Sequence, residues 1–330
     1  MIAAGRNPGR QVGRFFVLGF AGHAVPKPLQ EILAAHGLGG VILFGRNIAS
    51  REQLRTLTGA LISHSGHGHL VICTDQEGGG FQQLRPPHFT AFPAACDVRE
   101  DEALDFGRRM GEELSRGGIN LDLAPVLDVN SNPRNPIIGS RSFASQPDQV
   151  SRVAHSFVKG LAEQGVHACG KHFPGHGDTD QDSHVTLPTV SHPLERLRSI
   201  EFRPFLDLIR EGIPFLMTAH VLYPALDARH PATFSSRILV DLLRSEMAFQ
   251  GLLITDDLGM AGSLSQGDLQ EACIQAFAAG CDLLLVCEHH ERQPDLIEGL
   301  TEAIRKSPAL QQRAEETTAR AGRFWSTEER

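Results

Sequence analysis

Short runs of apolar residues recur along the chain, and longer amphipathic stretches separate them. The runs are almost uninterrupted, which is typical of parallel strands that are covered on both faces. The pattern predicts eight strands, at residues 15–20, 40–44, 70–75, 120–125, 166–173, 215–221, 252–257 and 282–287.

The stretches between these runs have the apolar spacing of helices. Helices are predicted at 100–115, 147–163, 193–210, 236–247 and 269–279, and over a tail from about 293 to 324. Ser50 and Gln53 form a capping-box pattern, which would open one more helix that carries Leu54, Leu57 and Leu61.

Strands and helices that alternate in this number predict an α/β fold, a single (β/α)8 TIM barrel. We expect one domain over residues 1–330, with the helical tail at its end. A doubly wound sheet is the alternative. That fold usually has a glycine-rich phosphate turn after its first strand, and no GxGxxG pattern follows Phe20.

Polar residues gather where the predicted strands end. They are Arg46, Asn47, Asp75, Glu77, Asp128, Lys171, His172, His220, Asp256 and Asp257. Each could close a turn or cap a helix. In a barrel, however, the carboxyl ends of the strands and the loops that follow them carry the catalytic groups. The agreement among ten such residues therefore predicts one shared active site.

The negative net charge argues against two classes of binding partner. The chain of 330 residues carries a formal charge of −8, which repels nucleic-acid backbones and anionic membranes, so we expect neither as a partner. The run FFVLGFAGHAV follows Arg10 and Arg14 and faintly resembles a signal peptide, but its glycines break it, and we interpret it as the first strand. These features predict a cytoplasmic protein that needs no protein partner.

Six cysteines are present, none of them in a CxxC pair, and several lie inside apolar runs. This placement predicts free, buried thiols and a reducing compartment, rather than a disulfide or zinc framework.

Residues 171–188, KHFPGHGDTDQDSHVTLP, have neither the period of a helix nor the alternation of a strand. Asp182 and His184 are two residues apart there, so in an extended loop their side chains would project to the same side. The carboxylate could orient the imidazole and raise its basicity, which would allow the pair to donate a proton and take one back. The spacing equally allows Asp182 to cap a turn beside a solvated His184.

Asp256 and Asp257 end the predicted strand at 252–257. A carboxylate at a barrel mouth can be a nucleophile, an electrostatic stabiliser or a metal ligand. Asp257 is the better candidate for a helix N-cap.

A metal site could in principle be assembled from His172, His176, Asp178, Asp182 and His184. Their spacing matches no strong metal signature such as HExxH, so we expect no metal and no other cofactor.

Two of these segments, KHFPGHGDTDQDSH and LLITDDLGM, resemble the family-3 glycoside hydrolases, and within them the exo-β-N-acetylglucosaminidase branch. GVILFGRNI, TDQEGG, LDLAPVLDV, RSF, MTAHVLYPALD and PATFSSRIL match in the same order. The resemblance implies a lone (β/α)8 barrel. It also implies a retaining β-N-acetylhexosaminidase that removes non-reducing terminal N-acetylglucosamine from small carbohydrates or muropeptides during peptidoglycan recycling.

The same resemblance implies roles for individual residues. Asp256 matches the nucleophile that forms a covalent glycosyl-enzyme, His184 matches the acid/base, and Asp182 matches its partner. Asp75, Arg141, Lys171 and His172 match residues that bind the sugar, and carboxylate, cation and imidazole are suitable partners for its hydroxyls.

The segment from Asp75 departs from the family pattern. Where the family usually reads DQEGGRVQRL, this chain has Gly80 and Gln83 in place of two arginines. Gln83 can still hydrogen-bond to substrate but lacks the charge and the rigid fork of a guanidinium. Arg85 is a candidate to reach in instead. We expect this change to affect substrate preference more than chemistry.

Three other functions fit part of the sequence. One is a phosphorylase of β-N-acetylglucosaminides or β-glucosides, because a histidine acid/base would not repel phosphate as a carboxylate would. Another is a catalytically silent sugar-binding protein. The third is a metal-dependent hydrolase, which would lose activity to chelators. Product analysis with and without phosphate distinguishes the first from a glycosidase.

Overall fold

The computed structural model describes residues 12–66, 70–180, 187–264 and 267–328. Within these ranges eight parallel strands form one sheet, in the order β10-β1-β2-β3-β6-β7-β8-β9. The strands are β1 Phe16–Leu18, β2 Gly40–Ile42, β3 Val71–Thr74, β6 Leu121–Asp122, β7 His167–Phe173, β8 Phe215–Thr218, β9 Leu252–Ile254 and β10 Leu284–Val286. Each lies inside one of the predicted apolar runs.

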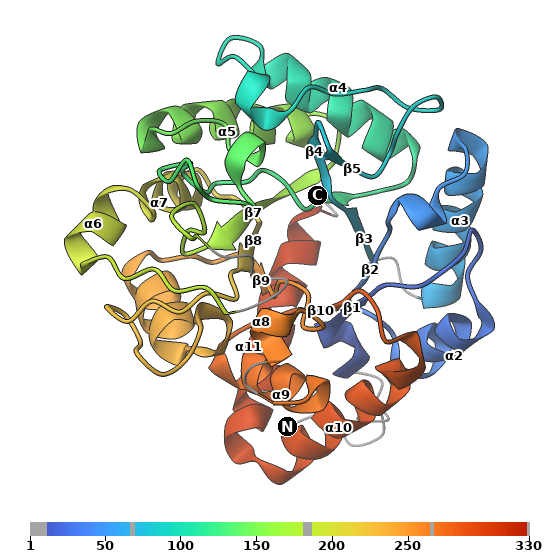
Figure 1. Ribbon diagram of the computed structural model, residues 1–330. Helices are drawn as coiled ribbons and strands as arrows, with labels where there is room; N and C mark the ends of the chain where they lie inside the picture. Colours follow the sequence, from blue (N-terminus) through green and yellow to red (C-terminus); the bar gives the residue numbers. More distant parts are fainter. Residues whose placement is uncertain (1–11, 67–69, 181–186, 265–266, 329–330) are drawn as a thin grey trace.

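The sheet closes on itself. The backbone N–H of Leu283, just before β10, donates to the carbonyl of Leu253 in β9 at 3.0 Å, and Ile254 forms a parallel bridge with Leu283. The last strand is therefore joined to both β1 and β9, and helices surround the strands (Figure 1). The predicted (β/α)8 barrel is confirmed.

The helices follow the predicted alternation. They are α2 Lys27–His36, α3 Arg51–Ser65, α4 Ala103–Arg116, α5 Pro147–Ala162, α6 Leu194–Ser199, α7 Arg203–Arg210, the π-type helix η6 Arg237–Glu246, α8 Ala261–Leu264, α9 Leu269–Ala279, α10 Gln293–Lys306 and α11 Pro308–Glu328. Short 3-10 turns link them: η1 Gly13–Phe15, η2 Gly45–Asn47, η3 Ala95–Asp97, η4 Gly139–Arg141, η5 Ala232–Phe234 and η7 His290–Arg292.

One predicted helix, at 193–210, is in fact two helices, α6 and α7. Pro204 explains the break. A proline at this place in a continuous helix would have no N–H for the carbonyl of Ile200, and its ring would clash with that carbonyl. In the structure Pro204 lies instead in the first turn of α7, where no intrahelical partner is needed.

The predicted cap of α3 is present. Ser50 Oγ accepts a hydrogen bond from the backbone N–H of Gln53 at 3.1 Å. The Gln53 side chain accepts from the backbone N–H of Ala49 at 2.8 Å, one residue before the cap itself. Two backbone donors at the helix start are thus satisfied, much as in the predicted box.

A two-stranded antiparallel ribbon, β4 Gln76–Gly78 with β5 Phe81–Gln82, follows β3 and was not predicted. Its turn requires glycine, because Gly78 and Gly79 have φ angles of 94° and 58°. Gly78 also lies so close to Pro93 that a Cβ would meet the Pro93 carbonyl oxygen at 2.2 Å. The ribbon places the side chains after Asp75 at the edge of the barrel mouth.

The apolar core has two parts. One lies inside the barrel and takes alternate residues from its strands, among them Val17, Cys73 and Phe215. The other, which includes Phe16 and Leu18, fills the space between the strands and the helices. Alternation within β1 thus divides neighbouring residues between the two, as expected of a strand covered on both faces.

All six cysteines are free thiols, as predicted; five of them are also buried as predicted, whereas Cys96 is exposed. Among the described residues, no helix is long and apolar enough to cross a membrane.

The amino-terminal end of the barrel is held by a buried carboxylate. Asp282 is fully buried before β10 and contacts three guanidiniums: Arg244 at 2.6 Å, Arg313 at 2.8 Å and Arg320 at 2.6 Å. Burial alone would raise the pKa of Asp282, but the three cations outweigh it and lower that pKa. Arg313 and Arg320 come from α11, so this cluster fixes the last helix against the barrel.

We predict that Asp282→Asn lowers the free energy of unfolding by about 3–5 kcal/mol at neutral pH, because it leaves three clustered guanidiniums without their counter-ion. Urea denaturation monitored by circular dichroism measures this. Because the folded-state pKa of Asp282 is depressed, its contribution is present above the ordinary pKa and is lost as the pH falls through the folded value. Glu302→Gln removes a carboxylate from an exposed ion pair with Arg305 and serves as the matched control, expected to leave stability unchanged. Equal effects of the two substitutions would contradict the role assigned to Asp282.

Candidate active site

A cavity of about 320 Å³ opens at the carboxyl ends of the strands. Its wall includes side chains from the segments after β2, β3, β9 and β10 and from β7 itself. Six of the eight predicted site residues line it: Asp75, Gln83, Arg141, Lys171, His172 and Asp256. The other two, Asp182 and His184, lie outside the described residues.

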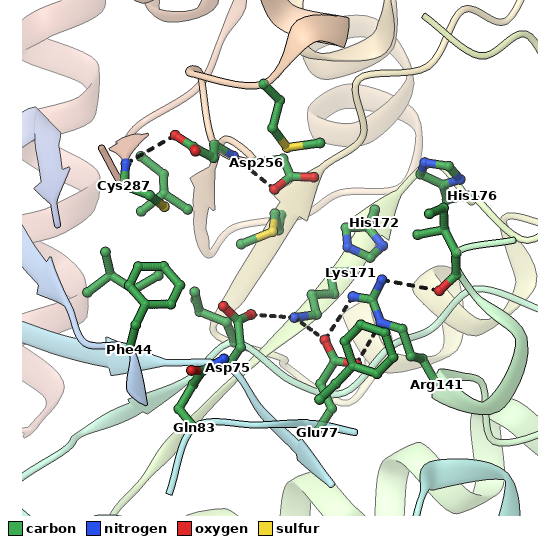
Figure 2. A pocket seen from close by; sticks show the side chains of 18 of the residues that line it. Phe44, Asp75, Glu77, Gln83, Arg141, Lys171, His172, His176, Asp256 and Cys287 are labelled. Carbon is green, nitrogen blue, oxygen red and sulfur yellow. Dashed lines mark hydrogen bonds and ion pairs between the residues drawn. The ribbon is translucent and has the colours of Figure 1, made fainter. Parts of the chain in front are cut away.

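Four charged side chains form a continuous chain of ion pairs along one wall (Figure 2). Lys171 Nζ lies 2.6 Å from Asp75 Oδ1 and 2.6 Å from Glu77 Oε1. Glu77 in turn accepts two hydrogen bonds from Arg141, from Nε at 2.7 Å and from Nη2 at 2.8 Å. We call these four residues the charge chain.

In the charge chain, burial and ion pairing shift the pKa values in opposite directions, and the effect of ion pairing is the larger. Burial would raise the pKa of Glu77, but Lys171 and Arg141 lower it to about 2. Burial would lower the pKa values of Lys171 and Arg141, but the neighbouring carboxylates raise both above their ordinary values. Glu77 is therefore ionised at neutral pH and cannot donate a proton in this site.

His172 is oriented from behind by Asp128. Asp128 is fully buried; its carboxylate lies 2.7 Å from His172 Nδ1 and accepts the backbone N–H groups of His172 and His176. Burial lowers the pKa of His172 well below its ordinary value, so the ring is neutral. Because Asp128 engages Nδ1, Nε2 is the ring nitrogen that faces away from it. Asp128, predicted at the rim, is thus a support beneath the cavity.

The two aspartates after β9 have different surroundings. Asp256 is half-buried and its Oδ1 accepts the backbone N–H of Asp257 at 2.8 Å. Asp257 Oδ1 accepts the N–H groups of Cys287 at 3.0 Å and Gly259 at 3.1 Å, which ties the end of β9 to the end of β10. Asp257 thus caps backbone groups, although the predicted partner was a helix start. That leaves Asp256 as the carboxylate of the pair suited to chemistry.

His220 also supports this turn. It is fully buried, with Nε2 3.0 Å from the carbonyl oxygen of Asp257 and Nδ1 2.8 Å from Thr233 Oγ1. A donor on Nε2 holds the carbonyl of Asp257, the residue after Asp256. His220 therefore lies near the rim, as predicted. Its side chain holds a backbone carbonyl, however, and does not line the cavity.

Gln83 is only partly available to a ligand. It lines the cavity, but its Oε1 accepts the backbone N–H of Gly45 at 2.9 Å. The suggestion that Arg85 replaces a missing arginine is wrong. Arg85 is exposed, donates through Nε to the carbonyl of Gln82 at 2.6 Å and is absent from the cavity wall.

Sequence reasoning placed Glu77 on the rim but gave it no role. Its role follows from the burial of two cations, Lys171 and Arg141, which need more than one carboxylate between them, and that burial is visible only in the structure. Phe44, Phe81 and Met260 also line the cavity and were not singled out. Within the described residues, no group of three His, Cys, Asp or Glu side chains is placed to hold a metal ion.

The chain is similar to known proteins over most of its length. Residues 12–323 match the glycosyl hydrolase family 3 N terminal domain. The beta-hexosaminidase of Idiomarina loihiensis is 39% identical over 279 residues, which cover 82% of this chain and 83% of that protein.

Two solved structures are also similar. A glycoside hydrolase family 3 beta-N-acetylglucosaminidase from Paenibacillus sp. has a TM-score of 0.91 and 36% identity over 97% of this chain, which spans 62% of that longer protein. NagZ from Neisseria gonorrhoeae, in complex with N-trifluoroacetyl-D-glucosamine, has a TM-score of 0.78 and 36% identity, with 92% of this chain and 89% of NagZ covered.

We predict that Glu77→Gln lowers the free energy of unfolding by about 3 kcal/mol at pH 7, since a fall in the pKa from 4.5 to about 2 corresponds to that stabilisation. A depressed folded-state pKa means that this contribution is present above pH 4.5 and is lost as the pH falls toward 2. Urea denaturation of both proteins at several pH values measures the difference. A difference that stays constant from pH 7 to pH 3 would contradict the assignment.

Proposed function

Because the chain belongs to glycosyl hydrolase family 3 and is a β-N-acetylhexosaminidase, we propose that it releases non-reducing terminal β-linked N-acetylglucosamine by a retaining double displacement. One observation carries this proposal. The Asp256 carboxylate shares a small cavity with Asp75, Arg141, Lys171 and His172, which are suitable partners for the hydroxyls of one sugar ring.

The charge chain and His172 bind the sugar in this proposal. Asp75 accepts hydrogen bonds from hydroxyls, and Lys171 and Arg141 donate to them. The neutral ring of His172 offers Nε2. Each cation is already paired with a carboxylate, so the pocket presents fixed dipoles and charges without an excess positive charge. Such a pocket is preorganised and needs little rearrangement when the sugar enters.

Asp256 is the nucleophile. One of its oxygens attacks the anomeric carbon, the bond from that carbon to the glycosidic oxygen breaks, and the leaving oxygen takes a proton. In the second step water attacks the same carbon, loses a proton, and the bond to Asp256 breaks. Two inversions give net retention of configuration. The hydrogen bond from the Asp257 N–H fixes one Asp256 oxygen.

His184 is the acid that protonates the leaving oxygen and the base that activates water, with Asp182 as its partner. The resemblance to the family supplies this assignment, and the described part of the cavity supports it indirectly. Glu77 has a pKa of about 2 and is unable to act as an acid at neutral pH. Asp257 Oδ1 accepts hydrogen bonds from two backbone N–H groups. A histidine titrates nearer neutrality and suits both proton transfers.

The substrate class we propose is cell-wall fragments that end in β-linked N-acetylglucosamine, with recycling of peptidoglycan as the role. The curated relatives at about 40% identity are bacterial beta-hexosaminidases, and the gonococcal NagZ structure holds an N-acylated glucosamine. An N-acyl sugar is the common chemistry of these similar proteins.

Hydrolysis of p-nitrophenyl β-N-acetylglucosaminide, measured beside the matching β-glucoside with and without phosphate, tests the function. We expect kcat/KM for the N-acetyl sugar to be at least about tenfold higher, because a site built around the amide leaves polar groups unpaired when the amide is absent. Phosphate should change neither rate nor product. Asp256→Asn gives the background rate.

Three results would contradict the proposal. Release from the glucoside alone would overturn the substrate class. A sugar 1-phosphate formed with phosphate present would identify a phosphorylase. Sugar binding without turnover would identify a binding protein.

A further inference from the structure

Phe81 is an exposed aromatic side chain at the edge of the cavity. It lies in β5, on the ribbon that follows β3, and 46% of its surface is exposed. It lines the same cavity as Asp75 and Lys171. Most other large apolar side chains in the described chain are buried, and Phe81 combines its exposure with a place in the wall of the active-site cavity.

The ring is held in place on one side. The Arg141 guanidinium carbon lies 4.7 Å from the centre of the Phe81 ring, and Arg141 is itself fixed by its two hydrogen bonds to Glu77. The guanidinium therefore covers one part of the aromatic surface, and contacts of this kind are favourable. Gly80, the residue before Phe81, has no side chain that could cover the ring. Phe81 thus presents a partly exposed aromatic surface, contacted by Arg141, next to the residues proposed to bind the sugar.

A sugar ring that follows the first one fits this surface. A pyranose carries an apolar face of C–H groups beside its hydroxyls, and aromatic rings in binding sites bury such apolar area. An anionic group on the aglycone has few unpaired cations to bind here. Among the described cavity residues, Arg141 and Lys171 are paired with Glu77 and Asp75, and Arg46 contacts Glu288 at 2.6 Å.

We propose that Phe81 is the platform on which the pyranose ring of the leaving sugar stacks, so that the enzyme recognises its aglycone by the face of a sugar ring and not by charge. The inference rests on the proposed function, because a leaving sugar exists only if the cavity cleaves a glycoside. Phe81 is then a specificity-determining residue. N-acetylglucosamine and the muramyl sugar of cell-wall fragments both have the apolar ring face that Phe81 would contact.

A comparison of two substrates distinguishes binding of the leaving sugar by Phe81 from an effect on bond cleavage. N-acetylglucosaminyl fluoride has a leaving group without a ring, whereas N,N′-diacetylchitobiose has a pyranose aglycone. We expect Phe81→Ala and Phe81→Leu to lower the ratio of kcat/KM for the disaccharide to that for the fluoride by about tenfold. Phe81→Trp should keep the ratio near the wild-type value. Val240→Ala, at a side chain that is 40% exposed on η6, is the control and should leave it unchanged.

A second arm repeats the comparison with N-acetylglucosaminyl-anhydromuramic acid, with and without its peptide. A parallel fall for this substrate would show that the shared ring face is recognised, as proposed. An unchanged ratio for both disaccharides would overturn the proposal. Equal losses on the disaccharides and the fluoride would also overturn it, because Phe81 would then act through Arg141 on the first sugar. If the wild-type enzyme cleaved none of the substrates, the proposed function itself would fail.

Discussion

The site depends on the positive charge of Lys171, whose side chain is buried in the wall of the cavity. An ammonium group taken out of water is strongly destabilised unless carboxylates surround it. Here Asp75 and Glu77 each lie 2.6 Å from Lys171 Nζ, and Arg141 compensates the second carboxylate. The four charges come from the segment after β3, from β4, from η4 and from β7. Only the closed barrel brings these distant parts of the chain together, so the fold is a condition of the charge pairing.

The two ends of the barrel use charge for different purposes. At the amino end, one carboxylate of Asp282 faces three guanidiniums and fixes α11 in place. At the carboxyl end, carboxylates and cations alternate and surround a cavity of about 320 Å³. In the first arrangement the carboxylate is fully buried and its charge is used for stability. The second is open to a ligand, and its polar groups can exchange solvent for sugar hydroxyls. This division is the one expected of a barrel enzyme.

The sequence allowed the strands to be predicted well, since the barrel strands are covered on both faces and most of their apolar runs are nearly uninterrupted. It also placed Asp75, Lys171, His172 and Asp256 on one rim, because strand ends in a barrel share an edge. Pairings across the barrel could not be predicted in this way. Nothing in the local pattern says that Glu77 holds both Lys171 and Arg141, because Glu77 lies 64 residues before Arg141 and further still before Lys171.

Local features were missed for other reasons. The break before α7 was overlooked because the apolar period continues through Pro204, and the proline outweighs that period. The ribbon of β4 and β5 was missed because its strands are shorter than the usual strand signal. The exposure of Phe81 follows from that ribbon. Arg85 was assigned by distance along the chain alone, and the turn of the chain after Gln82 directs it elsewhere.

Trapping the sugar on Asp256 tests the proposed mechanism directly. A 5-fluoro derivative of N-acetylglucosaminyl fluoride slows both steps, because its fluorine disfavours positive charge in the transition state, while the good leaving group lets the first step proceed. Protease digestion and mass spectrometry then locate the adduct. We expect one sugar per chain, attached to Asp256 in the peptide that contains LLITDDLGM. Turnover without any adduct, or a sugar attached to another residue, would contradict it.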